Sequence, residues 1–104
     1  MESMKLRLLK ELHKIPGIED RPSPVAEGTA LFYFGKEFAH FHSATELDLR
    51  LTRKVIKALG LQHPSDSLHH PKRSPNFPWI EVRFFNAEEV NRVVELVKIA
   101  ITQR

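Results

Sequence analysis

Cysteine is absent from this sequence of 104 residues. Its absence excludes disulfide bonds, thiolate catalysis, and metal or iron–sulfur sites with cysteine ligands. Long hydrophobic runs are also missing, because the longest span four or five residues, as at 30–34, whereas a membrane-spanning helix needs about 20. The N-terminal segment carries many charges and has no apolar signal-peptide core. We therefore expect a soluble, cytoplasmic protein with no membrane partner.

The composition is that of an ordinary globular protein, with 41% apolar and 28% charged residues. We expect residues 1–104 to form a single domain. The formal net charge is +3, and the positive excess lies between Lys36 and Pro78, where five of the six histidines also occur. This excess is compatible with an anionic partner such as nucleic acid but is too small to indicate one alone.

Hydrophobic periodicity predicts a helix at the N-terminus and a hairpin after it. The helix is expected to end at Pro16-Gly17, and residues 18–28, with two prolines, are expected to form a loop. Two runs rich in aromatic residues then flank Gly35-Lys36, which predicts a β-hairpin closed by a type II′ turn.

The predicted turn sets the register of the hairpin and therefore its two faces. The face expected in the core consists of Phe32, Phe34, Ala39 and Phe41. The opposite face is expected to carry Leu31, Tyr33, Phe38, His40 and His42.

The segment 46–51 alternates strictly between polar residues and leucines, which predicts a third strand. A helix is the alternative, because Ser43 to Glu46 has the form of a capping box and an apolar stripe continues to Leu59. We favour the strand, followed by a short helix that Thr52 caps and Gly60 ends.

Two further elements complete the prediction. Residues 79–85 alternate again and predict a fourth strand, after which Asn86 caps a C-terminal helix. The long loop 61–78 contains four prolines, three histidines and the Lys72-Arg73 pair, and a loop of this length is typically functional or mobile. The expected fold is therefore α+β in the order αβββαβα, a four-stranded, mainly antiparallel sheet with helices packed on one face.

The sheet face opposite the helices is expected to be polar and aromatic. An antiparallel sheet often exposes one face to water, so a plain solvated face is one interpretation. Another is a surface that binds a small ligand, a protein partner or a second copy of the chain. The residues expected on this face are Tyr33, His40, His42, Glu46, Asp48, Arg50, Trp79, Glu81 and Arg83.

His40 and His42 are two positions apart on a strand, so their side chains should point the same way, about 7 Å apart. This spacing suits two ligands of one metal ion, with Glu46, Asp48, His69 or His70 as a third. We take Asp48 as the third ligand of a possible divalent metal such as zinc, manganese or iron. The outer partners expected for the two imidazoles are Glu46, Glu81 and Tyr33.

Three functions are thus compatible with the sequence. The first is a binding module for an unknown small ligand or protein, which would use His40, His42, Asp48, Tyr33, Trp79, Arg83, His69 and His70. The second is a metal-dependent enzyme that uses His40, His42 and an acidic partner. The third is nucleic-acid binding through Lys72, Arg73, Arg50, Arg83 and exposed aromatic side chains.

The pattern G-x-E-x-x-H-x-H at 35–42 resembles the luciferase-domain family of small bacterial proteins. The resemblance covers about residues 30–100 and includes Asp48-Leu49, a helix that ends at Gly60, His69-His70 and a strand at Trp79-Ile80. It implies a strand at 46–51 and points to His40, His42 and Asp48 as functional residues. It implies no particular reaction.

Overall fold

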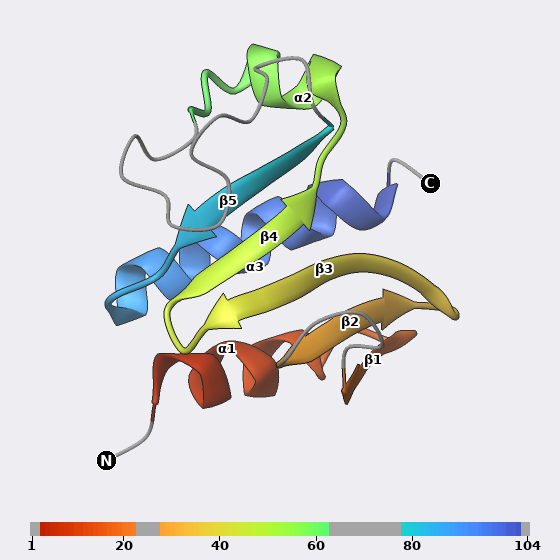
Figure 1. The fold of residues 1–104 in the computed structure, drawn as a ribbon, viewed down its shortest axis with the longest axis vertical. Coiled ribbons are helices and arrows are strands. Elements are labelled where there is room, and N and C mark those ends of the chain that lie inside the picture. The colour runs from red at the N-terminus through yellow and green to blue at the C-terminus, as the bar shows by residue number, and fades with distance from the viewer. Residues whose placement is uncertain (1–2, 23–27, 63–77, 103–104) are drawn as a thin grey trace.

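The structure of the protein is a computed structural model that describes residues 3–22, 28–62 and 78–102 (Figure 1). Its elements are α1 (Met4–Leu12), β1 (Ile18–Pro22), β2 (Thr29–Tyr33), β3 (Lys36–Ser43), β4 (Glu46–Arg50), α2 (Arg53–Ala58), β5 (Trp79–Arg83) and α3 (Ala87–Thr102). The strands form one antiparallel sheet in the order β1-β2-β3-β4-β5. The α+β class is confirmed, but the sheet has five strands where four were predicted.

The hydrophobic core lies between one face of the sheet and the two longer helices. Leu8 and Leu12 of α1 and Val93 of α3 join Leu47 and Leu49 of β4 in one buried cluster. Figure 1 shows α3 running behind β4 and β5. Of the helices in the described part of the chain, none is long and apolar enough to cross a membrane. The helices thus leave the other face of the sheet to the polar side chains.

Strand β1 corrects the prediction of a loop at 18–28. It pairs with β2 from Ile18 opposite Tyr33 to Pro22 opposite Thr29. Only Ile18 of this strand is buried, so the segment lacks the alternation that predicts a strand from sequence. The charges and the terminal proline suit an edge strand, which is hydrogen-bonded on one side only. Backbone pairing with β2 therefore forms an element that the side chains do not indicate.

The hairpin turn lies one residue earlier than predicted. Phe34 and Gly35 are its central residues, both with positive φ (47° and 86°), which is the type I′ pattern. The predicted core positions of Phe32 and Phe34 are therefore wrong: Phe34 is 72% exposed, and Phe32 is half-buried with Arg21 over its ring. Leu31 is buried instead, and Tyr33 packs against the core rather than beside the histidines.

A β-bulge restores the predicted faces beyond the turn. Phe32 pairs with Glu37 and Leu31 with Ala39, so Phe38 is an extra residue in β3, and its side chain is 2% exposed. A bulge of this kind shifts the register by one residue. Ala39 and Phe41 consequently enter the core as predicted, whereas Phe38 is buried where exposure was expected.

The described elements of the second half of the chain follow the prediction, and most of the predicted loop at 61–78 lies outside the described residues. The side chain of Thr52 caps α2 by accepting a hydrogen bond from the Val55 amide, so the alternative of a continuous helix from 44 to 59 is wrong. At the start of α3, the Asn86 Oδ1 accepts from the Glu89 amide at 2.9 Å. The Glu89 carboxylate in turn accepts from the Phe85 amide at 2.8 Å. These caps lie next to the ends of β4 and β5, which carry most of the polar face.

Candidate metal centre

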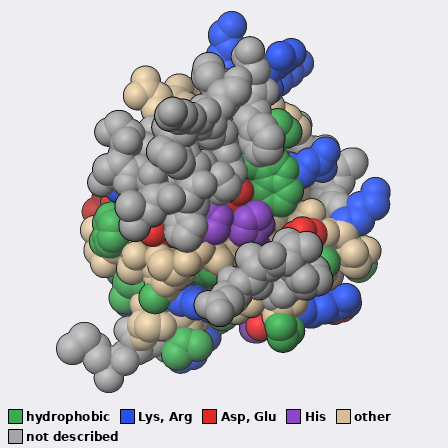
Figure 2. All heavy atoms as spheres, viewed as in Figure 1, with side chains coloured by type: hydrophobic (Ala, Val, Ile, Leu, Met, Phe, Trp, Pro, Cys, Tyr) green, Lys and Arg blue, Asp and Glu red, His purple; other side chains and the backbone are tan. Residues whose placement is uncertain are grey.

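One row of cross-strand partners crosses the face of the sheet opposite the helices. Ala30 of β2 pairs with His40 of β3, His40 with Asp48 of β4, and Asp48 with Glu81 of β5. Neighbouring strands lie about 4.8 Å apart, so these side chains stand next to one another. Figure 2 shows histidine side chains together near the middle of this face, with acidic side chains beside them.

A second bulge in β3 brings the side chain of His42 next to that of His40. Phe41 pairs with Leu47 and Ser43 with Glu46, which leaves His42 as the extra residue of β3. Bulges re-aim a side chain locally. The ring centroids of His40 and His42 lie 5.0 Å apart, closer than the about 7 Å expected of two alternate residues on a regular strand.

Potential ligand atoms of His40, His42 and Asp48 all lie within 4.8 Å of one another. The His40 Nε2 is 3.5 Å from the Asp48 Oδ2. Because bonds from zinc to nitrogen or oxygen are about 2.0–2.2 Å long, two ligand atoms of one ion are separated by up to about 4 Å. Small side-chain rotations therefore suffice for all three residues to reach one ion.

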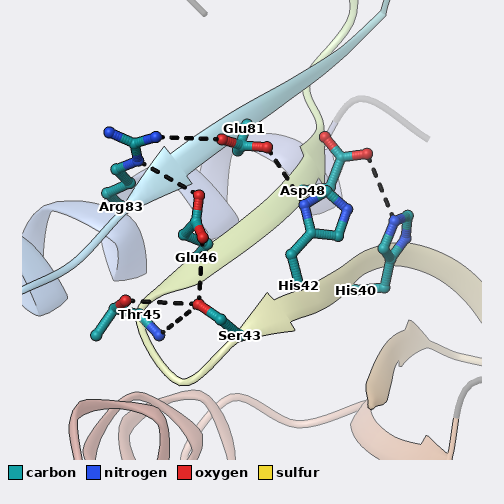
Figure 3. Close-up of polar contacts among 8 residues, drawn as sticks. All are labelled: His40, His42, Ser43, Thr45, Glu46, Asp48, Glu81 and Arg83. Carbon is teal, nitrogen blue, oxygen red and sulfur yellow. Dashed lines mark hydrogen bonds and ion pairs between the residues drawn. The ribbon is translucent and has the colours of Figure 1, made fainter. Parts of the chain in front are cut away.

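Each imidazole also has a carboxylate beside its other nitrogen. The His42 Nδ1 lies 3.3 Å from the Glu81 Oε1, and the His40 Nδ1 lies 3.8 Å from the Glu37 Oε2. In Figure 3 the remaining nitrogen of His42 is on the side of His40. In metal-bound histidines the second nitrogen almost always donates a hydrogen bond to such a partner, which fixes the tautomer and the orientation of the ring. Here the two carboxylates lie near the rings but neither contact is a hydrogen bond.

Glu81 is itself held by a polar chain across β4 and β5 (Figure 3). The Arg83 Nη2 lies 3.9 Å from the Glu81 Oε2, and the Arg83 Nε donates to the Glu46 Oε2 at 3.4 Å. Ser43 donates from its hydroxyl to the other oxygen of Glu46. Glu46 thus contacts Arg83 and not an imidazole, and of the predicted outer partners Glu81 alone lies beside one of the two rings.

The charges of the site favour a cation. Asp48 and Glu81 are each 2% exposed and are direct cross-strand partners. Like charges in this arrangement are destabilising, and burial of carboxylates adds a desolvation cost. A cation bound by Asp48 would be attracted to both carboxylates.

The other predicted site residues are placed as follows. Trp79 is half-buried, and its ring lies 5.4 Å from that of His40, so it forms an aromatic wall beside the site. Tyr33 lies on the other face, as described above. Arg50 is exposed at the end of β4. His69, His70, Lys72 and Arg73 lie outside the described residues.

Sequence reasoning missed Glu37. The predicted register placed it opposite Phe34, away from His40, whereas the turn and the bulge bring its carboxylate to the His40 ring. The spacing Glu37-x-x-His40 was the available signal, but a strand without a bulge would direct these two side chains to opposite faces.

Comparison with known proteins gives one family. A family model described as Luciferase domain matches residues 35–100. No curated protein and no solved structure gave a significant match. The matched segment contains His40, His42, Asp48 and both outer carboxylates, Glu37 and Glu81.

Proposed function

This chain belongs to the luciferase-domain family, and we propose that it binds one divalent transition-metal ion through His40, His42 and Asp48. The observation that supports the proposal most strongly is the convergence of the three side chains, whose ligand atoms lie within 4.8 Å. Two imidazoles and one carboxylate are a donor set that zinc, manganese and iron(II) accept.

Burial supports a metal site over a plain solvated face. A solvated face would keep its charged groups in water, but Asp48 and Glu81 are almost fully buried. Buried carboxylates are ordinarily paired or coordinate metals. The outer carboxylates beside both imidazoles are a second, independent feature that a solvated face does not require.

Three protein ligands would leave the metal with open coordination positions. Structural zinc sites are closed by four protein ligands, whereas catalytic sites keep a position for water or substrate. The side chain of His40 is 26% exposed, which gives access from its side of the site. We therefore propose that the polar face binds its small-molecule ligand at the metal, which would polarise the ligand or activate a water molecule.

Metal binding should depend on His40. We expect one equivalent of divalent metal per chain in untagged protein. Added zinc or manganese should also raise the melting temperature, because an ion that binds only the folded state stabilises it by about 2.7 kcal/mol at 100 times its Kd. His40→Ala should abolish the shift. His13→Ala is the matched control, because His13 is an exposed histidine that contacts Asp20 far from the site in sequence. Equal shifts in the wild type and in His40→Ala would contradict the proposal.

Glu81→Gln should weaken metal binding while it retains the fold. Glutamine keeps the size of the side chain but lacks the negative charge that lies 3.3 Å from the His42 Nδ1. Loss of an outer partner typically lowers metal affinity by 10- to 100-fold, so we expect a change of about that size. Calorimetric titration with zinc measures it. Unchanged affinity would show that Glu81 does not orient His42.

A further inference from the structure

We propose a second binding site, separate from the metal centre, that takes a small phosphorylated ligand such as a nucleoside phosphate. The site is a cavity of about 670 Å³ formed by α2 and the residues after it. Pockets for small molecules commonly have volumes of 300–1,000 Å³. The described lining consists of Arg53, Lys54, Ile56, Lys57 and residues 60–62.

The three cations of the cavity lack acidic partners within the described part of the chain. Some cations elsewhere in that part pair with nearby carboxylates, as Lys14 does with Glu11 and Lys98 with Glu95, whereas others, such as Arg7 and Arg92, do not. Arg53, Lys54 and Lys57 form no ion pair with a described residue, and no described carboxylate lines the cavity. The described lining of the cavity therefore presents three positive charges to a ligand.

The spacing of these cations is unfavourable for the helix itself. Arg53 and Lys57 are four residues apart, and Lys54 and Lys57 are three apart, so both pairs are neighbours on the surface of α2. Like charges at these spacings destabilise a helix. A bound anion would relieve both repulsions, which is the physical reason to expect one here.

An apolar floor is fixed beside the cations by the way α2 ends. The Leu61 amide donates to the Ile56 carbonyl at 3.1 Å, and the Gly60 amide donates to the Lys57 carbonyl at 3.1 Å. With Gly60 at φ 67°, this is a Schellman motif, which typically brings the two apolar side chains together. Ile56 itself is buried in the core, so the partly buried Leu61 supplies the apolar surface, and three cations next to it suit a phosphate group attached to an apolar or planar moiety.

The test uses ADP as the probe and metal-free protein in EDTA, so that the metal centre plays no part. We expect calorimetry to give a 1:1 complex, weaker binding of pyrophosphate, which lacks the planar moiety, and none of adenosine, which lacks the charge. The triple variant R53Q/K54Q/K57Q should bind ADP at least tenfold more weakly. The triple K10Q/K14Q/K98Q removes the same charge from exposed lysines elsewhere and should bind as the wild type does.

Two results would overturn the proposal: no ADP binding by the wild type at millimolar concentration, or equal loss in the two triple variants, which would indicate a net-charge effect. If the cavity triple fails to fold, Lys57→Gln alone serves, since Lys57 belongs to both like-charge pairs. Asp48→Asn should leave ADP affinity unchanged, so that failure of this site and failure of the metal site are distinguishable.

Discussion

Replacing Asp48 with asparagine is expected to abolish metal binding and, at the same time, to leave the stability of the metal-free protein nearly unchanged. Asp48 is the buried member of the predicted ligand set and the cross-strand partner of Glu81. Loss of a direct ligand should lower affinity by more than the 10- to 100-fold that loss of an outer partner causes. Asparagine removes one of two facing negative charges but also the charged contact with His40, so the free energy of unfolding of the metal-free protein should change by less than about 1 kcal/mol.

Zinc titration and urea denaturation in EDTA measure the two effects on the same variant. Asp20→Asn is the matched control, because Asp20 is also an aspartate in contact with a histidine but is exposed on β1. We expect the control to change neither quantity. Wild-type zinc affinity in Asp48→Asn would contradict the proposed ligand set, and strong destabilisation without metal would show that Asp48 is primarily structural. Loss of binding without loss of stability is what we expect of a residue that serves the site and not the fold.

Phe38→Ala is expected to destabilise the protein by about 3–5 kcal/mol, as is typical when a buried phenylalanine is truncated. Phe38 is the extra residue of the first bulge and is 2% exposed within the core cluster. The loss is large against a total stability of about 5–15 kcal/mol for a small domain. Urea denaturation followed by circular dichroism gives the value.

Phe34→Ala is the control that separates the two possible hairpin registers. Phe34 is 72% exposed, so its truncation should cost less than about 1 kcal/mol. With the turn at Gly35-Lys36, as the sequence predicted, Phe34 would be in the core and Phe38 outside it. A larger loss of stability in Phe34→Ala than in Phe38→Ala would therefore support the register predicted from sequence. In that register Glu37 lies away from the His40 ring.

Local sequence signals were sufficient for most of the fold. Thr52, Gly60 and Asn86 mark the ends of α2 and the start of α3, because capping depends on residues within one turn of the helix. The alternation in β4 and β5 reflects one buried and one polar face. Strand β1 has no such signal, since its pairing with β2 is a long-range contact of a mostly exposed edge.

The candidate site was predictable in its ligands but not in its outer partners. Alternation alone placed His40, His42 and Asp48 on one face, and the structure brings them together. The positions of Glu37 and Tyr33 depend instead on a turn with Phe34 at positive φ and on a bulge at Phe38. A bulky residue rarely adopts positive φ, so the sequence favoured a glycine-first turn and a register one residue away.

The most direct test of the metal centre is an anomalous difference map from crystals grown with zinc. We predict one strong peak about 2.0–2.2 Å from a nitrogen of His40, a nitrogen of His42 and an oxygen of Asp48, with Glu37 and Glu81 behind the two imidazoles. A map with no peak between these three side chains, or with strong zinc peaks only at other places, would contradict the account.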